Sequence, residues 1–245
     1  MRDEELLSLL RRAADAVGAA VDGQHRLGPS GLRPTQYRAD LLADAAALEV
    51  LHAGGLRVVS EESGATGEGE LTCVLDPIDG STNFDRGIPF YSVSMCVLDE
   101  GVPRCALVRN LATAMSYEAV RGGGATRDGA AIRVSSATTV ATSIVAFSGL
   151  PARHGGWAQF RALGAASLEL CAVADGSLDA YAVVGSSRLS PWDYLGALLV
   201  LQEAGGTIRD AGGLELVEAS SARRRPVGAA TEALCDAIIE FVSTQ

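Results

Sequence analysis

The apolar residues at the start of the chain recur every three or four positions. They are Leu6, Leu7, Leu9, Leu10, Ala13, Ala14, Val17 and Val21. This spacing places the apolar side chains on one face and predicts an amphipathic helix over residues 3–22. The same kind of pattern predicts a second helix over residues 37–53, which ends at Gly54-Gly55. Both helices therefore need an apolar surface to cover.

Short apolar runs between turn-forming residues predict strands in the middle of the chain. The predicted strands are residues 56–60, 73–75, 89–98, 105–109 and 114–119. Pro77 is expected to end the strand at 73–75, because proline has no N–H for the ladder. The polar residues 65–70 are expected to form a loop. Asp128-Gly129 is a hairpin signal, and no Gly-Lys-Ser/Thr follows the glycines at 122–124, so we interpret this region as a hairpin rather than a phosphate-binding loop.

Strands and helices alternate in the rest of the chain. The predicted strands are residues 143–147, 178–184, 207–208 and 226–229, and the predicted helices are residues 165–174, 192–204 and 232–242. Gly205-Gly206 follows the second of these helices, where a C-terminal glycine is expected. The chain shows no internal repeat. A strand-rich first half followed by alternation is typical of the α+β and α/β classes.

Composition and charge narrow the function classes. The 245 residues are 48% hydrophobic and 20% charged, which is typical of a soluble globular protein with one large domain or two closely packed halves. The net charge of −10 argues against nucleic acid as a partner. All 20 basic residues are arginine, so any cationic side chain that contacts a phosphate must be a guanidinium. The charged N-terminus and the absence of an apolar run of roughly 18 residues lead us to expect a cytoplasmic protein with no membrane partner.

The cysteines do not suggest a disulfide framework or a zinc site. Cys73, Cys96, Cys105 and Cys171 lie in apolar runs, and the total of five is odd. We expect them to be reduced residues of the core.

Polar residues with metal and phosphate chemistry are concentrated where the apolar run at 73–75 ends. The stretch reads Asp76-Pro77-Ile78-Asp79-Gly80-Ser81-Thr82-Asn83-Phe84. Two carboxylates come first, a glycine permits a tight turn, and hydroxyls with exposed N–H groups follow at the start of a helical turn. Carboxylates hold a hard cation and N–H groups hold an anion, a combination that suits a metal-bound phosphate. The alternative is an ordinary exit from a strand into a turn, which the same residue types favour.

This stretch closely resembles the signature of the inositol monophosphatase superfamily, Mg²⁺-dependent, lithium-sensitive phosphatases that include the fructose-1,6-bisphosphatases. Further matches follow in the family's order at Glu61-Glu62-Ser63-Gly64, Gly122 to Gly129, Gly164 to Cys171, Asp175 to Tyr181 and Pro191-Trp192-Asp193. The resemblance implies a layered αβαβα sandwich. Residues 1–134 would form an N-terminal half that carries most metal ligands, and residues 135–245 would form a C-terminal half that completes the active site. A homodimer is also implied.

The resemblance further implies a site for two or three Mg²⁺ ions. The implied metal ligands are Glu61, Asp76, Asp79, Asp193 and the backbone carbonyl of Ile78. Carboxylates crowded without cations would raise each other's pKa, and the metal ions would compensate that repulsion. The alternatives are that Glu61-Glu62 is a solvated pair after a strand and that Asp193 is an ordinary acidic residue at a helix N-terminus.

Glu61, Ser81 and Asp40 are the implied catalytic residues. In the family, a threonine just after the glycine of the motif orients the attacking water together with an upstream aspartate. Ser81 holds the first position here and keeps the hydroxyl, and Asp40 in the second predicted helix holds the other. The implied activity is hydrolysis of a phosphomonoester by metal-activated water. The implied substrate is a small phosphorylated polyol or sugar, namely inositol monophosphate and/or fructose 1,6-bisphosphate.

The phosphate is expected to lie against the N–H groups of the glycine turn. The implied substrate-binding residues are Asp79, Gly80, Ser81, Thr82, Gly164, Ala165, Ala166 and Arg188. Val183 stands where inositol monophosphatases have a glutamate that binds a substrate hydroxyl, and Arg188 lies in a longer connection before Trp192. This pattern looks more like the dual inositol-phosphate and fructose-bisphosphate phosphatases of archaea. Arg188 is a candidate for a second phosphate or a ring hydroxyl, against the alternative of an exposed loop arginine.

Other functions compete with this one. A haloacid-dehalogenase-type phosphatase needs Asp-x-Asp after a strand, whereas this chain has Asp76-x-x-Asp79. A phosphatase of the same fold could act on histidinol phosphate or a 3′-phosphonucleotide. The chain could also be a non-catalytic phosphosugar-binding protein, although retention of all four carboxylates and of the Ser81 hydroxyl argues for catalysis.

Overall fold

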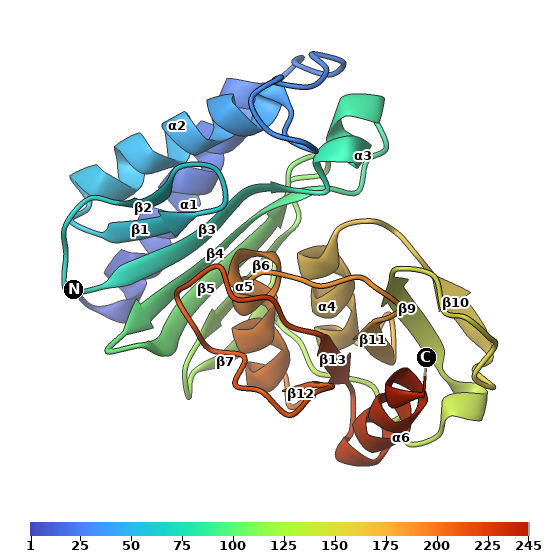
Figure 1. Ribbon diagram of the computed structural model, residues 1–245. Helices are drawn as coiled ribbons and strands as arrows, with labels where there is room; N and C mark the ends of the chain where they lie inside the picture. Colours follow the sequence, from blue (N-terminus) through green and yellow to red (C-terminus); the bar gives the residue numbers. More distant parts are fainter. Residues whose placement is uncertain (245) are drawn as a thin grey trace.

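Helices α1 (Asp3–Val21) and α2 (Arg38–Ala53) lie side by side as the outermost layer of the protein, a computed structural model that describes residues 1–244 (Figure 1). The apolar positions that predict α1 are all buried. They face the adjacent sheet and α2, so the helical period of the sequence corresponds to real packing. Both helices end within a residue of the predicted boundaries.

The sheet beneath these helices has eight strands. They are β1 (Arg57–Ser60), β2 (Gly64–Thr66), β3 (Thr72–Asp79), β4 (Ser92–Asp99), β5 (Val102–Asn110), β6 (Ser116–Val120), β7 (Gly124–Arg127) and β8 (Ala130–Ala131). Their order is β2-β1-β3-β4-β5-β6-β7-β8, and all neighbours are antiparallel except β1 and β3. Asp128 and Gly129 both have positive φ and join β7 to β8, as the hairpin signal predicts.

Two expectations about this sheet are wrong. The strand predicted at 73–75 does not end at Pro77, because β3 continues to Asp79. The register between β3 and β4 shifts between Asp76 and Asp79, and a proline is tolerated at such an irregularity because the ladder there does not use its missing N–H. Residues 65–70 are not wholly a loop, since Gly64–Thr66 pairs with β1.

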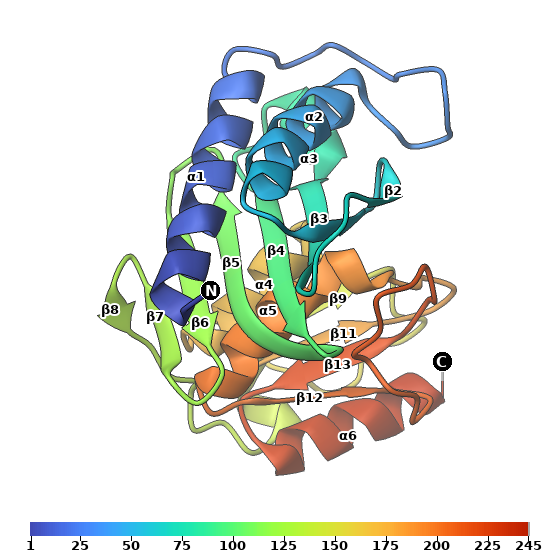
Figure 2. The same cartoon turned by 90° about the vertical axis from the view of Figure 1, so that its left-hand side faces the viewer.

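The second half supplies the remaining three layers. Helices α4 (Ala166–Ala174) and α5 (Pro191–Glu203) lie between the two sheets, and α6 (Glu232–Ser243) covers the outer face of the second sheet (Figures 1 and 2). That sheet contains β9 (Ile144–Ser148), β10 (Gln159–Arg161), β11 (Ala180–Val183), β12 (Thr207–Asp210) and β13 (Pro226–Ala229) in the order β10-β9-β11-β13-β12. β10, β9 and β11 run parallel, and β13 is antiparallel to both its neighbours. The sequence analysis missed β10. The short helices α3 (Ser81–Arg86) and η1 (Val140–Thr142) complete the order.

Three buried clusters hold the layers together. One lies between α1, α2 and the eight-stranded sheet, one surrounds α4 and α5, and one lies between the second sheet and α6. All five cysteines are buried and free, which confirms the prediction made for Cys73, Cys96, Cys105 and Cys171. The order of layers is therefore αβαβα, which confirms the predicted fold. The division into halves at 134/135 stays a prediction.

Candidate active site and metal centre

Three carboxylates from distant parts of the chain converge where β1, β3 and α5 meet. β1 and β3 are parallel neighbours with Ser60 opposite Leu75, so the next residues, Glu61 and Asp76, lie together. Asp193, in the first turn of α5, completes the group, and one oxygen from each carboxylate lies within 4.8 Å of the other two. The parallel pairing and the helix start thus build an acidic cluster from residues that are far apart in sequence.

Crowding and burial strongly perturb these carboxylates. Burial raises the pKa of Glu61 to about 8, with the charges of Asp193 and Glu62 adding to the rise. Burial also raises the pKa of Asp193 to about 7, against the backbone N–H of Ser190 and the Arg223 guanidinium, which lower it. The pKa of Asp76 is raised well above its ordinary value by burial and by the charge of Glu61. Such a cluster needs cations to be fully ionised near neutral pH.

The donor atoms fit a hard divalent cation. Asp76 is 2% exposed, and its Oδ1 is buried without a hydrogen-bond partner. A buried oxygen without a donor is costly in a folded protein unless a ligand meets it. The three converging groups offer oxygen atoms, which Mg²⁺ prefers. The residues present therefore fit the Mg²⁺ that the sequence resemblance implies, and Glu61, Asp76 and Asp193 would hold it.

Asp79 lies beside this cluster, but its side chain turns to the N-terminus of α4. It accepts hydrogen bonds from the backbone N–H of Ala166 at 3.3 Å, the N–H of Ser167 at 2.7 Å and the Ser167 hydroxyl. Burial raises the pKa of Asp79 to about 6, and these donors lower it. Asp79 thus fixes α4 against the end of β3, and its role as a metal ligand stays a prediction.

Asp40 and Asp193 are held in the same way. Each is the third residue of its helix and accepts a hydrogen bond from the backbone N–H three residues earlier. The bonds are 2.8 Å from Tyr37 to Asp40 and 2.7 Å from Ser190 to Asp193. This helix-capping contact fixes both side chains. Asp193 is therefore an acidic residue at a helix N-terminus, as the alternative states. The same position also directs its carboxylate into the acidic cluster.

Ser81 and Asp40 meet at the side of the site formed by α2 and α3. Asp40 is 3% exposed, and the pKa of its carboxyl is about 6, because burial raises it while Tyr37 and Ser81 lower it. The Ser81 hydroxyl donates a hydrogen bond to the Ile78 carbonyl at 2.8 Å. Tyr37 and Thr82 are linked through their hydroxyls at 3.1 Å, which ties the start of α2 to α3. The residues predicted to orient a water are therefore neighbours.

Gly80 allows the turn from β3 into α3 to pack closely. Its φ is +90°, and a Cβ there would lie 3.1 Å from the Ala165 Cβ, 3.1 Å from the Gly164 carbonyl oxygen and 3.2 Å from the Phe90 carbonyl oxygen. Asn83 holds the same turn by donating to the carbonyls of Phe90 at 2.8 Å and Leu163 at 2.7 Å. Predicted substrate-binding residues on α3 and before α4 are thus in contact.

Replacement of Gly80 by alanine is expected to inactivate the protein and to destabilise it by about 2–4 kcal/mol, from left-handed strain and overpacking together. Gly101→Ala is the matched control, because Gly101 has φ +80° but no atom within 4 Å of an added Cβ. Denaturant unfolding and phosphate release measure both effects. A Gly80→Ala protein as stable and active as Gly101→Ala would contradict the importance of this contact.

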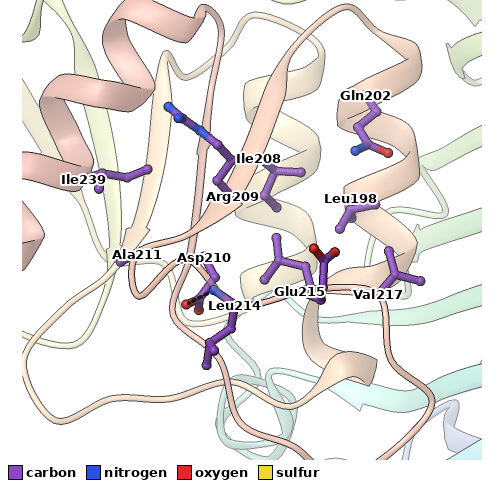
Figure 3. Close-up of a pocket in the computed structure, with 12 residues that line it drawn as sticks. Leu198, Gln202, Ile208, Arg209, Asp210, Ala211, Leu214, Glu215, Val217 and Ile239 are labelled. Atoms are coloured by element: carbon purple, nitrogen blue, oxygen red, sulfur yellow. Dashed lines mark hydrogen bonds between the residues drawn. The ribbon is translucent and has the colours of Figure 1, made fainter.

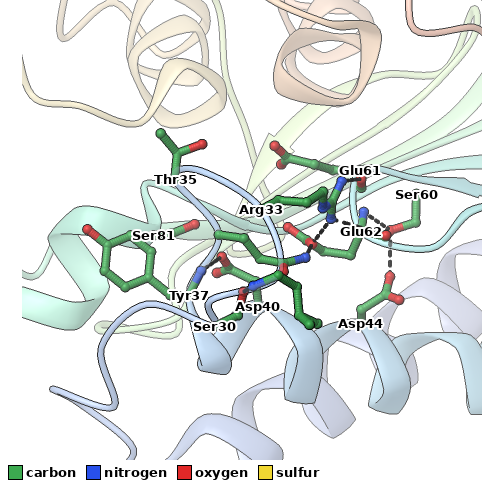
Figure 4. A network of polar contacts seen from close by, with 12 residues as sticks. Ser30, Arg33, Thr35, Tyr37, Asp40, Asp44, Ser60, Glu61, Glu62 and Ser81 are labelled. Atoms are coloured by element: carbon green, nitrogen blue, oxygen red, sulfur yellow. Dashed lines mark hydrogen bonds and ion pairs between the residues drawn. The ribbon is translucent and has the colours of Figure 1, made fainter.

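Hydrogen bonds and an ion pair hold the loop between α1 and α2 against Glu62, as Figure 4 shows. Arg33 donates to the backbone carbonyls of Glu61 at 3.2 Å and Glu62 at 3.1 Å, and it forms an ion pair with the Glu62 carboxylate. The Gln36 amide donates to the same carboxylate. The Glu62 side chain is 5% exposed, so the solvated-pair alternative is wrong for Glu62. Sequence reasoning missed Arg33 because no periodicity marks it.

The structure also places the residues predicted to set specificity. Val183 is fully buried in the core around α4 and α5, so it offers no polar group. Arg188 is exposed and, among residues 1–244, donates only to the backbone carbonyls of Gly185 at 3.2 Å and Ser187 at 2.6 Å. Arg223, which the sequence analysis missed, donates to the carbonyl of Arg188 at 3.2 Å.

The glycine run before β7 binds a side chain of the protein itself. The N–H groups of Gly122 and Gly124 donate to the Glu203 carboxylate at 2.8 and 2.9 Å. This contact closes the hairpin against the end of α5. It agrees with the prediction that the run is not a phosphate-binding loop.

A pocket lies away from the carboxylates. Its volume is about 480 Å³, and α5, β12, α6 and the loop after β12 line it (Figure 3). Two of its charged residues have partners, since Arg209 pairs with Asp236 and Asp210 accepts from the N–H groups of Gly212 and Arg225. The pocket does not contain the carboxylates of the acidic cluster. Among residues 1–244, no helix is long and apolar enough to span a membrane.

Comparison with known proteins identifies the family. A model described as the inositol monophosphatase family matches residues 33–244. A fructose-1,6-bisphosphatase/inositol-1-monophosphatase of Archaeoglobus fulgidus is 34% identical over 239 residues, covering 95% of this chain and 90% of the relative. A putative Nus factor SuhB of Neisseria meningitidis is 36% identical over 177 residues, covering 64% and 65%. The solved structure of an inositol monophosphatase from Anabaena has a TM-score of 0.81 and 25% identity, covering 98% of this chain and 96% of that one. The chain belongs to the inositol monophosphatase family and is a phosphatase of that family.

Proposed function

We propose that the protein is a Mg²⁺-dependent phosphomonoester hydrolase that acts on a small phosphorylated polyol or sugar, namely inositol monophosphate and/or fructose 1,6-bisphosphate. The observation that carries this proposal is the convergence of Glu61, Asp76 and Asp193, together with the buried Asp76 Oδ1, which has no hydrogen-bond partner. The name of the Archaeoglobus relative includes both activities and supports the substrate class.

The residues around the cluster have separate tasks. Glu61, Asp76 and Asp193, with Asp79 and the Ile78 carbonyl, would hold Mg²⁺, which would supply positive charge for the phosphate and would activate a water. Backbone N–H groups of Gly80, Ser81 and Thr82 bind phosphate oxygens at the start of α3. Gly164, Ala165 and Ala166 form the facing wall of this turn.

Asp40 and Ser81 orient the attacking water. The Ser81 hydroxyl donates its hydrogen bond to the Ile78 carbonyl, so the lone pairs of its oxygen remain available to accept a hydrogen bond. Asp40, with a pKa of about 6, is mostly ionised at pH 7 and accepts a second one. Two acceptors fix the orientation of one water, which favours attack on a phosphate held nearby.

The substrate panel that tests this proposal contains inositol 1-phosphate, fructose 1,6-bisphosphate, histidinol phosphate and a 3′-phosphonucleotide. With Mg²⁺ present, kcat/KM for phosphate release should be at least about tenfold higher for the first two substrates than for the last two, because we propose that the site binds sugar and polyol esters. A preference for histidinol phosphate or the nucleotide would change the proposed substrate class but would still agree with a phosphatase.

Size-exclusion chromatography of the same protein tests the proposed homodimer, and fractionation of the source cells tests the proposed cytoplasmic location.

A non-catalytic role is the second candidate, because one relative is named as a Nus factor. Against it, the carboxylates of the cluster and the Ser81 hydroxyl are all present and in place. Release of phosphate from a generic aryl phosphate only when Mg²⁺ is added would favour catalysis. No release from any ester under these conditions would favour the binding role.

Lithium is expected to inhibit phosphate release at millimolar concentrations, as the family resemblance implies. Li⁺ is a small, hard cation that carboxylate oxygens bind, so it should compete for one of the Mg²⁺ positions. Initial rates across a lithium series, with sodium at equal ionic strength as the control, measure the effect. Equal rates in both salts would argue against lithium sensitivity.

A further inference from the structure

Helix α2 carries two buried carboxylates, and the proposed reaction uses only one of them. Asp40 and Asp44 are four residues apart, so their side chains lie on the same side of the helix. Asp40 is proposed to orient the attacking water. Asp44 is 6% exposed and has no part in that reaction. Burial of a carboxylate is costly unless other groups compensate it, so the contacts of Asp44 indicate its task.

The Ser60 hydroxyl connects Asp44 to the residues that follow β1, as Figure 4 shows. Ser60 is buried, and its hydroxyl donates a hydrogen bond to the Asp44 carboxylate. The same hydroxyl oxygen accepts the backbone N–H of Glu62 at 3.2 Å. A hydroxyl can donate one hydrogen bond and accept two. Because Asp44 receives the donated bond, the lone pairs of Ser60 are left for the Glu62 N–H.

Glu61 lies between the two residues that this second bond joins. A serine oxygen that accepts the N–H two residues later closes a turn around the residue between them. The Glu61 backbone has two further contacts, since its N–H donates to the Leu75 carbonyl at 3.1 Å and its carbonyl accepts from Arg33 at 3.2 Å. Asp44 therefore supports, through Ser60, a turn in which the backbone of Glu61 is held on both sides.

This support matters because the three carboxylates of the acidic cluster differ in how their backbones are held. Asp76 lies within β3 and Asp193 within α5, whereas Glu61 follows the last residue of β1. A glutamate side chain also has more rotamer freedom to lose than an aspartate. Mg²⁺ tolerates little departure from octahedral geometry. Glu61 is thus the carboxylate whose position depends most on hydrogen bonds from side chains.

We propose that Asp44 is a positioning residue for the metal ligand Glu61 and that it acts through the Ser60 hydroxyl. This inference rests on the proposed Mg²⁺ site and deepens it. Asp44 binds Ser60 and is not one of the converging carboxylates, so its effect reaches the cation through the backbone of residues 60–62. Partners that orient a metal ligand typically change metal affinity by about 10–100-fold when they are removed.

Titration calorimetry of the chelator-treated protein with Mg²⁺ at about pH 8 tests this role, because the carboxylates must be ionised to bind. Asp44→Asn removes the charge but keeps an oxygen that can accept from Ser60, so its Kd should stay close to that of the wild type. Ser60→Ala keeps the charge and removes the link, so its Kd should rise roughly tenfold. Asp44→Ala should show the same rise as Ser60→Ala.

The double variant Asp44→Ala/Ser60→Ala should bind Mg²⁺ no more weakly than either alanine variant, because each substitution breaks the same link. It also leaves neither partner of the Ser60–Asp44 bond buried alone, so it tests the lost link even where a single variant does not fold. Circular dichroism at the temperature of the titration shows which variants are folded. Additive losses in the double variant would overturn the action of Asp44 through Ser60.

Asp210→Ala is the matched control. Asp210 is also 6% exposed and also holds a backbone turn, through the N–H groups of Gly212 and Arg225. It belongs to β12 and not to the acidic cluster. Its replacement should lower the free energy of unfolding and leave the Kd for Mg²⁺ unchanged.

The outcomes separate this role from the proposed function. An unchanged Kd in Ser60→Ala and in the double variant would overturn the positioning role and would mean that the Asp44–Ser60 contact only stabilises the fold. A rise in Asp44→Asn as large as in Asp44→Ala would overturn it too, because the charge alone would then matter. Both results leave the proposed Mg²⁺ site in place. A wild type that binds no Mg²⁺ would overturn the site and the positioning role together.

Discussion

Replacement of Asp76 or Asp193 by asparagine is expected to abolish phosphate release while the fold stays intact. Both carboxylates belong to the converging cluster, and asparagine has nearly the same volume but no charge. Loss of a residue that only supports a metal ligand reduces activity by roughly 10–100-fold, so loss of a ligand should cost at least about a hundredfold. Steady-state phosphate release with Mg²⁺ measures kcat for each variant.

The metal-free variants should be at least as stable as the wild type. The pKa of Asp76 is raised by burial and by the charges of Glu61 and Asp79, so its negative charge opposes folding without cations. Asparagine removes that charge, and in Asp193→Asn the amide oxygen can still accept the Ser190 N–H. Thermal unfolding with a chelator at about pH 8 should therefore show an equal or higher midpoint.

Asp15→Asn is the matched control for these variants. Asp15 is on α1, its side chain is 70% exposed, and it pairs with Arg109 away from the cluster. The control should keep its activity and stability, because exposed ion pairs contribute little. Near-normal turnover of Asp76→Asn, or a large loss of metal-free stability, would show that this carboxylate is not a metal ligand.

Helices α1, α2 and α6 could be predicted closely from the sequence because their burial follows the helical period. Helix α5 is buried on nearly every side, and it could be predicted from its apolar residues and the Gly205-Gly206 that follows it. The ends of strands were harder to predict than the ends of these helices. Pro77 was expected to end its strand, yet the register shift between Asp76 and Asp79 accommodates it within β3. A local rule about proline does not include the partner strand, and the partner strand decides whether an N–H is needed.

The acidic cluster could be predicted from the resemblance of the sequence motifs, but the orientation of each side chain could not. Asp79 and Asp193 have the same residue type and similar surroundings. Asp193 points into the cluster, whereas Asp79 is engaged by the N-terminus of α4. That difference depends on where α4 lies, which is a property of the layered packing rather than of the nearby sequence.

Arg33 and Arg223 lie in polar segments without periodicity or motif. Their contacts are with Glu62 and Arg188, which are 29 and 35 residues away along the chain. Arginines are common at protein surfaces, so neither residue stands out by type. Only the folded chain shows that one fastens the loop before α2 and that the other lies beside Asp193.

The metal-free protein should lose stability as the pH rises from about 5 to about 8, and Mg²⁺ should restore it. Folding raises the pKa of Glu61 to about 8 and that of Asp193 to about 7, chiefly through burial. Unfolded carboxyls titrate near pH 4, so between these values the folded state binds more protons than the unfolded state. Stability must then decrease with rising pH across this window and level off above the folded pKa values. The total change is on the order of several kcal/mol, since one pKa unit corresponds to about 1.4 kcal/mol and the groups are coupled.

Magnesium binds only the ionised carboxylates, so it should raise the melting temperature more at about pH 8 than at about pH 5.5. Calorimetry with chelator, with Mg²⁺ and with sodium at equal ionic strength separates binding from screening. Glu169 provides an internal control, because burial raises its pKa to about 7 while its carboxylate accepts from the Leu163 N–H at 2.7 Å, outside the acidic cluster. Its share of the pH dependence should persist with Mg²⁺ and disappear in Glu169→Gln. A melting temperature independent of pH without metal, or a Mg²⁺ effect equal at both pH values, would mean that the cluster is not the cation site.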